Sequence, residues 1–138
     1  LGKFHNFIYG NAKFIFFVSL AILIFFQIFS SLFIPLIYGD DYQESVKIFN
    51  ILVYSSFFLY NGAIFGAGLQ AAHKQKYYLF ATFFGVIVNI IGNLFLIPLY
   101  SARGAAIATV ITEICVSSLL FISFIKFVPK YGERILRE

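Results

Sequence analysis

The chain has 138 residues, of which 61% are hydrophobic and 12% are charged, with a formal net charge of +4. Its mean hydropathy is +0.91. An average soluble domain is about a quarter charged, so this composition excludes an ordinary soluble domain, which could not bury so much apolar surface. We therefore expect lipid to be the solvent for much of the chain. The first residue is Leu1 rather than a methionine, and we expect the chain to be a fragment of a longer protein.

The hydrophobic residues gather in four runs, at roughly residues 14–37, 48–72, 78–99 and 105–125. A helix needs about 20 residues to cross the ~30 Å hydrocarbon core of a bilayer, and each run is long enough. Lipid offers the backbone no hydrogen-bond partner, which favours helices, and the runs lack the alternation of barrel strands. We predict an all-α, integral membrane helical bundle of about four transmembrane helices, formed by residues 1–138 as one unit.

The segments between the runs differ in charge. Eight basic residues fall in the N-terminal segment, in the loop between the second and third runs, and in the C-terminal tail: Lys3, Lys13, Lys74, Lys76, Lys126, Lys130, Arg134 and Arg137. The other two connections hold only Lys47 and Arg103, and the first of them, residues 39–47, is mainly acidic. The positive-inside rule therefore predicts that both ends of the chain are cytoplasmic and that these two connections face outward.

Each run carries a polar residue near its middle, in chain order Gln27, Asn61, Asn89 and Glu113, and Asn93 lies one helical turn beyond Asn89. Amides at such depth commonly join helices by hydrogen bonds worth roughly 0.6 to 2 kcal/mol each. They also line the polar cavities at the midplane of transporters. Both interpretations stay open from the sequence.

Glu113 differs from the amides because it is the one ionisable group deep in any run. A charged carboxylate there costs several kcal/mol, so it must be paired, protonated or in contact with water. No Lys or Arg lies inside the runs to pair with it, and both a functional role and a structural hydrogen bond are open. We expect Asn89, Asn93 and Glu113 to form one polar cluster between the third and fourth helices, which a tight turn makes antiparallel neighbours.

Small residues recur at helical spacing. Gly62 and Gly66 are four residues apart in the second run, and Gly104 and Ala108 begin a similar stripe in the fourth. Such stripes let helix backbones approach closely in lipid. We expect them to pack against neighbouring helices, and a sliding surface between moving helices is the alternative.

The residue patterns of soluble enzymes do not occur. His5 and His73 have no partner at metal-ligand spacing, and the sequence contains neither a glycine-rich phosphate loop nor a nucleophile motif. We therefore expect no enzymatic activity, cofactor or metal. The basic residues flank the runs, so we expect them to meet membrane lipids rather than nucleic acid.

Three stretches carry a resemblance to a known family. They are residues 34–42 with 48–52, residues 68–74, and residues 89–100 with 104–109 and Glu113. Over roughly residues 13–128 the chain resembles the C-terminal region of polysaccharide biosynthesis flippases, the O-antigen and lipid-linked oligosaccharide translocases of the multidrug/oligosaccharidyl-lipid/polysaccharide exporter superfamily. The third stretch, with its paired Asn residues, is the most specific. The family often has Gly where this chain has Ser101.

The resemblance implies a transporter of the bacterial inner membrane that moves an isoprenoid-diphosphate-linked sugar between leaflets. The family has more helices than this chain supplies, so the partners would be the remaining helices of the transporter and the lipid-linked oligosaccharide. Basic residues that meet the diphosphate would lie in those remaining helices. Related drug exporters couple transport to cations through carboxylates, as Glu113 would allow. The alternatives are such a cation-coupled drug exporter, or a small membrane subunit that transports nothing.

Overall fold

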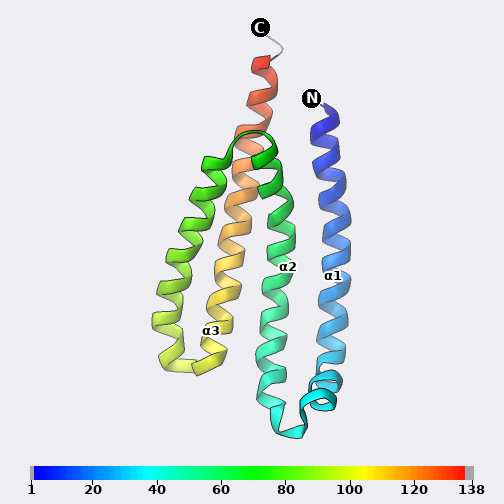
Figure 1. Cartoon of the computed structure of the whole chain (residues 1–138), viewed down its shortest axis with the longest axis vertical. Coiled ribbons are helices and arrows are strands. Elements are labelled where there is room, and N and C mark those ends of the chain that lie inside the picture. Colours follow the sequence, from blue (N-terminus) through cyan, green and yellow to red (C-terminus); the bar gives the residue numbers. More distant parts are fainter. Residues whose placement is uncertain (1, 136–138) are drawn as a thin grey trace.

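The computed structural model describes residues 2–135, and this part of the chain is helical and contains no strand. The helices are α1 (Gly2–Tyr38), the short 3-10 helix η1 (Asp40–Tyr42), α2 (Gln43–Ala71) and α3 (Gln75–Ile135). α2 runs antiparallel to α1, and α3 runs away from the end of α2 and then folds back (Figure 1). Both termini therefore lie at one end of the bundle. The predicted all-α fold is confirmed.

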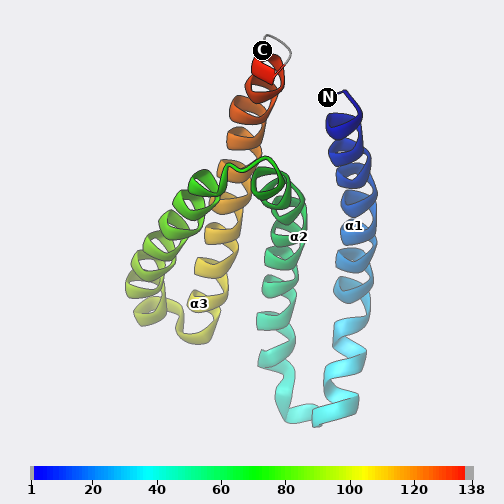
Figure 2. The ribbon, with the colours of Figure 1, turned by 45° about the horizontal axis from the view of Figure 1, so that its top comes forward.

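The predicted count of four helices is not matched. Three stretches are long and apolar enough to cross a membrane, namely Asn6–Tyr38, Gln43–Ala71 and Gln75–Val128. The third stretch contains both of the last two predicted runs, because a single residue with a non-helical backbone separates two helical segments. That residue is Ser101, with φ 52° and ψ −132°. We call residues 75–100 the first arm of α3 and residues 102–135 the second arm; the two lie side by side (Figures 1 and 2).

The ends of the helices follow from local hydrogen bonds rather than from hydropathy. α2 ends because His73 has a φ of 55°, which turns the chain. The Lys74 amide then donates to the Leu69 carbonyl at 2.8 Å, and the His73 amide donates to the Gln70 carbonyl at 3.0 Å. This pair of bonds is a Schellman motif, which satisfies carbonyls that the helix end would leave unpaired.

The connection from α1 to α2 depends on a glycine. Gly39 has a φ of 97°, a conformation that costs little only for glycine. Its amide donates to the Pro35 carbonyl at 2.8 Å. The helices also extend beyond the predicted runs, since α1 begins at Gly2 and α2 at Gln43. Hydropathy marks the apolar part of a helix, whereas polar residues continue the same backbone hydrogen bonding outside it.

α2 packs between α1 and α3. The core lies toward the end that holds the termini and consists of Ile8, Leu69, Ala81, Leu120, Phe124 and Val128. Elsewhere little is covered: the most apolar windows of the three stretches are 6%, 17% and 11% buried. Side chains such as Leu36 and Phe95 are more than two thirds exposed. So much exposed apolar surface marks contact with lipid or with other helices.

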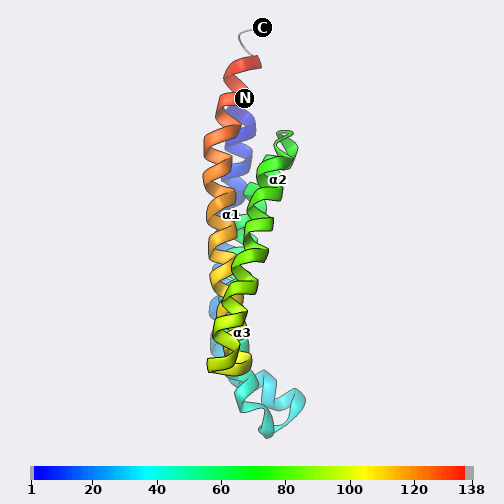
Figure 3. The same ribbon diagram turned by 90° about the vertical axis from the view of Figure 1, so that its left-hand side faces the viewer.

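Different charged residues lie at the two ends of the bundle. Loop 72–74, which contains Lys74 and is followed by Lys76, lies at the same end as the termini (Figure 3). The opposite end holds Glu44, whose carboxylate bonds the Lys47 ammonium at 2.9 Å and also pairs with the Arg103 guanidinium. This second pair joins the start of α2 to the turn of α3. Of the basic residues counted in the sequence, Arg137 lies outside the described residues, as do the side chains of three others: Lys3, Lys130 and Arg134.

Candidate functional site

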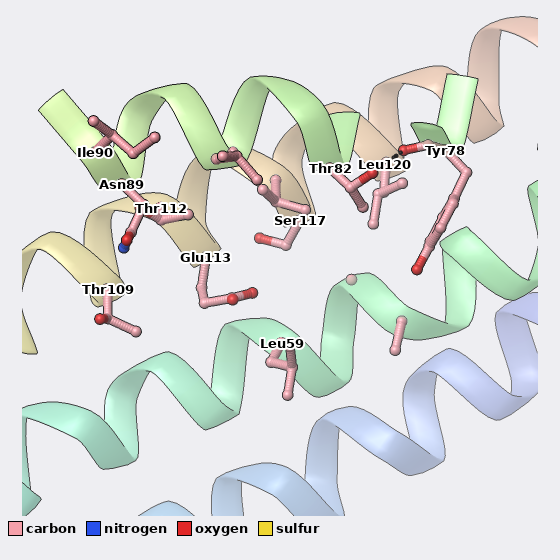
Figure 4. A pocket seen from close by; sticks show the side chains of 15 residues that line it. Leu59, Tyr78, Thr82, Asn89, Ile90, Thr109, Thr112, Glu113, Ser117 and Leu120 are labelled. Atoms are coloured by element: carbon pink, nitrogen blue, oxygen red, sulfur yellow. Dashed lines mark hydrogen bonds between the residues drawn. The ribbon is translucent and has the colours of Figure 1, made fainter. Parts of the chain in front are cut away.

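A cavity of about 420 Å³ lies between α2 and the two arms of α3. Its polar lining comes mainly from the two arms: Tyr78, Thr82, Asn89, Thr109, Thr112, Glu113 and Ser117. The remaining lining is apolar or glycine and includes Leu59 and Gly62 of α2. The cavity is therefore a mostly apolar space with one carboxyl group and several hydroxyl groups (Figure 4).

Glu113 reaches into this cavity from the second arm, toward Leu59 of α2 (Figure 4). Its side chain is half-buried. Within residues 2–135 no hydrogen bond or ion pair to its carboxyl group is formed, and no Lys, Arg or His lines the cavity. The group therefore has no fixed positive partner in the described chain, and a proton or a cation from outside can take that place.

The two asparagines of the first arm form a chain of hydrogen bonds. Asn93 Nδ2 donates to Asn89 Oδ1 at 2.9 Å, and Asn89 Nδ2 donates to Thr112 Oγ1 at 3.3 Å. The Thr112 hydroxyl donates in turn to the Ala108 carbonyl at 2.8 Å. These bonds join the two arms at mid-height. Asn93 Oδ1 is buried and has no partner among the described residues.

The expected cluster of two asparagines and Glu113 is therefore divided. Asn89 and Glu113 line the same cavity, while Asn93 does not line it. Thr112, next to Glu113 in the chain, is the residue that accepts the amide hydrogen bond. Glu113 itself stays outside the hydrogen-bonded chain.

Gln27 and Asn61 lie at a different interface, between α1 and α2. Gln27 Nε2 donates to the backbone carbonyl of Asn50 at 2.8 Å. Asn61 Nδ2 donates to Ser19 Oγ at 2.9 Å and to the Phe57 carbonyl at 2.8 Å. In this chain both side chains join helices, and neither lines the cavity of Glu113.

The small residues lie where helices approach closely. A Cβ on Gly62 would lie 2.8 Å from Ser117 Cβ, and one on Gly66 would lie 3.1 Å from the Tyr78 ring. The two arms of α3 meet in the same way, because a Cβ on Gly92 would lie 3.1 Å from that of Ala108. Gly104 faces the backbone of Leu96. Gly62 and Ser117 also line the cavity, so it begins beside a close contact of α2 with the second arm.

Sequence reasoning missed several partners of the predicted residues. Asn50 Oδ1 accepts a hydrogen bond of 2.6 Å from the buried Ser30 hydroxyl, and neither residue was singled out. Ser30 lies about one helical turn after Gln27 in α1, and Asn50 accepts hydrogen bonds from both side chains. Their similar distance in sequence from the turn at Gly39 was the available signal. Thr82 and Thr109 were missed as cavity residues, because threonine is common in transmembrane packing and gives no pattern of its own.

Comparison with known proteins gives one relative of note. The chain is similar to a protein of Methanocaldococcus jannaschii whose name describes it as an uncharacterized membrane protein, with 34% identity over 100 residues. The match covers 64% of this chain and 24% of the relative, so the chain spans about a quarter of the relative's length. No described family matches the chain, and no solved structure matches it. The apolar helices and this similarity agree that the chain is a membrane protein.

Proposed function

We propose that this chain is the C-terminal part of a flippase of the bacterial inner membrane, which moves lipid-linked oligosaccharide or polysaccharide precursors between leaflets. The observation that supports this most is that the most specific stretch of the resemblance lies beside the polar cavity. That stretch, residues 89–100 with 104–109 and Glu113, supplies Asn89, Thr109 and Glu113, three of the polar residues of the cavity. The most specific stretch of the resemblance thus contributes the carboxyl group and two further polar side chains to the cavity.

In this proposal the two arms of α3 cross the membrane separately, which gives four crossings with both ends in the cytoplasm. The apolar stretch of α3 has 54 residues; a straight helix of that length would measure ~80 Å, far more than the ~30 Å core. Folding back at Ser101 brings each arm close to the required length. The basic loop at 72–74 then lies in the cytoplasm, and the pair of Glu44 and Arg103 lies outside.

Labelling of single cysteines tests this topology. Gln43 and Gln75 form a matched pair, because each is exposed and each begins a helix, α2 and α3 respectively. In a Cys115→Ala background, Gln43→Cys should react with an impermeant maleimide added to intact cells, and Gln75→Cys should react only after the cells are opened. The reverse pattern would contradict the proposed orientation, and labelling of both in intact cells would contradict the crossings.

The cavity suggests the role of Glu113 in transport. Its carboxyl group takes up a proton or a monovalent cation when the cavity opens to one side, and it releases that charge on the other side. The cavity lining has no basic side chain for the diphosphate of the substrate, so the remaining helices of the transporter must provide it. The lipid-linked oligosaccharide and these helices are the proposed partners, and no chemical reaction is catalysed.

A cation-coupled drug exporter is the second candidate, and one observation favours it. Among the described residues that line the cavity, Glu113 has the only carboxyl group and no side chain is basic, which suits a cationic or apolar compound better than a diphosphate. A strain that lacks its own O-antigen flippase separates the two functions. The full-length protein should restore surface polysaccharide; export of a cationic dye without such restoration would identify the drug exporter instead.

The same strain tests Glu113. Glu113→Gln in the full-length protein should reach normal membrane levels and lose transport, because glutamine keeps the shape and cannot change charge. Glu44→Gln is the control, since it removes a carboxylate at the exposed end of the bundle and should keep transport. Transport retained by Glu113→Gln would refute coupling. Residues 1–138 alone should not restore polysaccharide, and restoration by them would contradict the need for further helices.

A further inference from the structure

Hydrogen bonds divide the described chain into two units. Three of them join α1 to α2, at 2.6–2.9 Å: Gln27 Nε2 to the Asn50 carbonyl, Ser30 Oγ to Asn50 Oδ1, and Asn61 Nδ2 to Ser19 Oγ. The two arms of α3 form the second unit, since the hydrogen bond from Asn89 to Thr112 joins them. Separating the helices of either unit in lipid would leave polar groups without partners, which costs free energy. We therefore expect each unit to move as one body.

The interface between these two units is held together differently. Among the side chains that the structure describes, one polar contact joins α2 to α3, the ion pair of Glu44 and Arg103. The rest of the interface consists of apolar and small residues, such as Gly62 against Ser117, and of the cavity that Glu113 lines. Lipid tails contact an apolar helix face about as well as another helix does, so α2 and α3 can part without breaking a hydrogen bond inside the membrane.

The two ends of this interface are not equivalent. At the end that holds the termini, Leu69 of α2 packs in the core with Phe124 of the second arm, and loop 72–74 connects α2 directly to α3 (Figure 1). At the opposite end no short connection links α2 to α3, and the Glu44–Arg103 pair joins the start of α2 to the turn of α3. The first end can therefore act as a pivot, and the second end is free to open when the ion pair breaks.

The ion pair can break and form again at little cost. The Arg103 and Glu44 side chains are 43% and 64% exposed, so water solvates both groups when they part. Lys47, one turn along the same helix, bonds the other carboxylate oxygen at 2.9 Å, and Glu44 keeps this partner without Arg103. Thr109, a cavity residue of the second arm, follows Arg103 by six residues, or roughly 9 Å of helix. The pair therefore lies just beyond the cavity, on the side of the turn.

We propose that the Glu44–Arg103 pair is a latch that controls access to the cavity of Glu113. The formed pair holds the hairpin of α3 against α2. When the pair breaks, the hairpin pivots about loop 72–74 and the adjacent core, and the cavity widens at the end near the turn. An exposed pair changes such an equilibrium roughly two- to fivefold, so the latch favours the closed state without fixing it. The pivoting is independent of the substrate, whereas its use in transport rests on the proposed function.

The reaction of a cavity cysteine with N-ethylmaleimide tests the latch, because a shielded thiol reacts in proportion to the population of open molecules. The full-length protein carries Cys115→Ala and is reconstituted in vesicles. Arg103→Gln should then raise the rate at Thr109→Cys roughly two- to fivefold. Losing a positive charge near a thiol by itself lowers the thiolate fraction and slows the reaction, so an increase measures opening. Thr82→Cys, toward the other end of the cavity (Figure 4), should gain less because it lies nearer to the pivot.

Two substitutions serve as matched controls for Arg103→Gln. Lys47→Gln removes the partner of Glu44 that lies on the same helix and should leave the rate at Thr109→Cys unchanged. Arg103→Lys keeps the positive charge and should also leave it unchanged. High salt should raise the rate when Arg103 is present, because it screens an exposed pair, and should have no effect in Arg103→Gln. An unchanged rate in Arg103→Gln, or an equal increase in Lys47→Gln, would overturn the latch. Equal increases at Thr82→Cys and Thr109→Cys would overturn the pivot.

The latch and the flippase proposal fail separately. Because the latch shifts the equilibrium only a few fold, Arg103→Gln and Glu44→Gln should both still restore surface polysaccharide in the strain that lacks its own flippase. Faster labelling of Thr109→Cys in Arg103→Gln, with no restoration by the unsubstituted protein, would support the latch and refute the flippase. Restoration by the unsubstituted protein, with labelling that Arg103→Gln does not change, would refute the latch alone.

Discussion

Replacing Ser101 with glycine should stabilise the protein, because Ser101 forms the turn between the two arms of α3. Its φ of 52° and ψ of −132° lie close to the first central position of a type II′ turn, where glycine is the favoured residue. A non-glycine residue in such a region costs about 1–3 kcal/mol. Glycine loses roughly 0.5–1 kcal/mol more conformational entropy on folding. Since the exposed Ser101 hydroxyl forms no hydrogen bond within the described residues, the net gain should be about 1 kcal/mol.

Ser118→Gly is the matched control. Ser118 is an exposed residue in the interior of the second arm, where glycine has no positive φ to adopt and should lower the stability by roughly 0.5–1 kcal/mol. Both variants are unfolded with sodium dodecyl sulfate in mixed micelles, and the loss of helicity is followed by circular dichroism. The two substitutions should change the free energy of unfolding with opposite signs. A loss in Ser101→Gly equal to that in Ser118→Gly would refute the turn geometry.

Two further predictions concern packing and hydrogen bonds. Gly104→Ala should lower the stability by about 2 kcal/mol or more, because the new Cβ would lie 2.5 Å from the carbonyl carbon of Leu96. Gly10→Ala is the control: a Cβ there would meet nothing within 4 Å, so the variant should be neutral or slightly stabilised in the same micelles. Equal effects of the two substitutions would contradict the close contact of the arms. Asn50→Ala should cost about 1 kcal/mol, because the Ser30 hydroxyl loses its acceptor. Adding Ser30→Ala to that variant should cost little more, and strictly additive costs in a double-mutant cycle would show that the bond does not form.

The sequence predicts the helical fold and the position of the apolar segments, because hydropathy over about 20 residues depends on composition and not on contacts. It predicts the number of separate helices less well. A tight turn was expected between the third and fourth runs, and the structure makes it with the backbone of Ser101 alone. A serine in the sequence does not indicate a positive φ, because residues other than glycine rarely adopt one. The family that the chain resembles often has Gly at this position, which agrees with the observed φ.

The sequence identifies the polar residues inside the apolar runs, but it predicts neither their relative levels in the bundle nor their partners. Gln27, Asn61, Asn89 and Glu113 each lie near the middle of a predicted run. The structure does not bring them to one level, because Gln27 bonds Asn50 whereas Asn61, further along α2, bonds Ser19. Which faces meet depends on how each helix is rotated, and packing decides this. The structure therefore places Gln27 and Asn61 between α1 and α2, away from the cavity of Glu113, although all four residues looked equivalent in the sequence.

Glu113 differs from the predicted amide side chains in its hydrogen bonding. Gln27, Asn61 and Asn89 each donate to another helix or arm of this chain, as residues that join helices must. Glu113 receives no hydrogen bond from the described residues, although it faces a cavity. A purely structural role would therefore require a donor from outside this chain, and a glutamine at position 113 would serve such a donor equally well. A coupling role requires only a proton or cation, which glutamine cannot exchange. The two roles thus predict opposite outcomes for transport by Glu113→Gln.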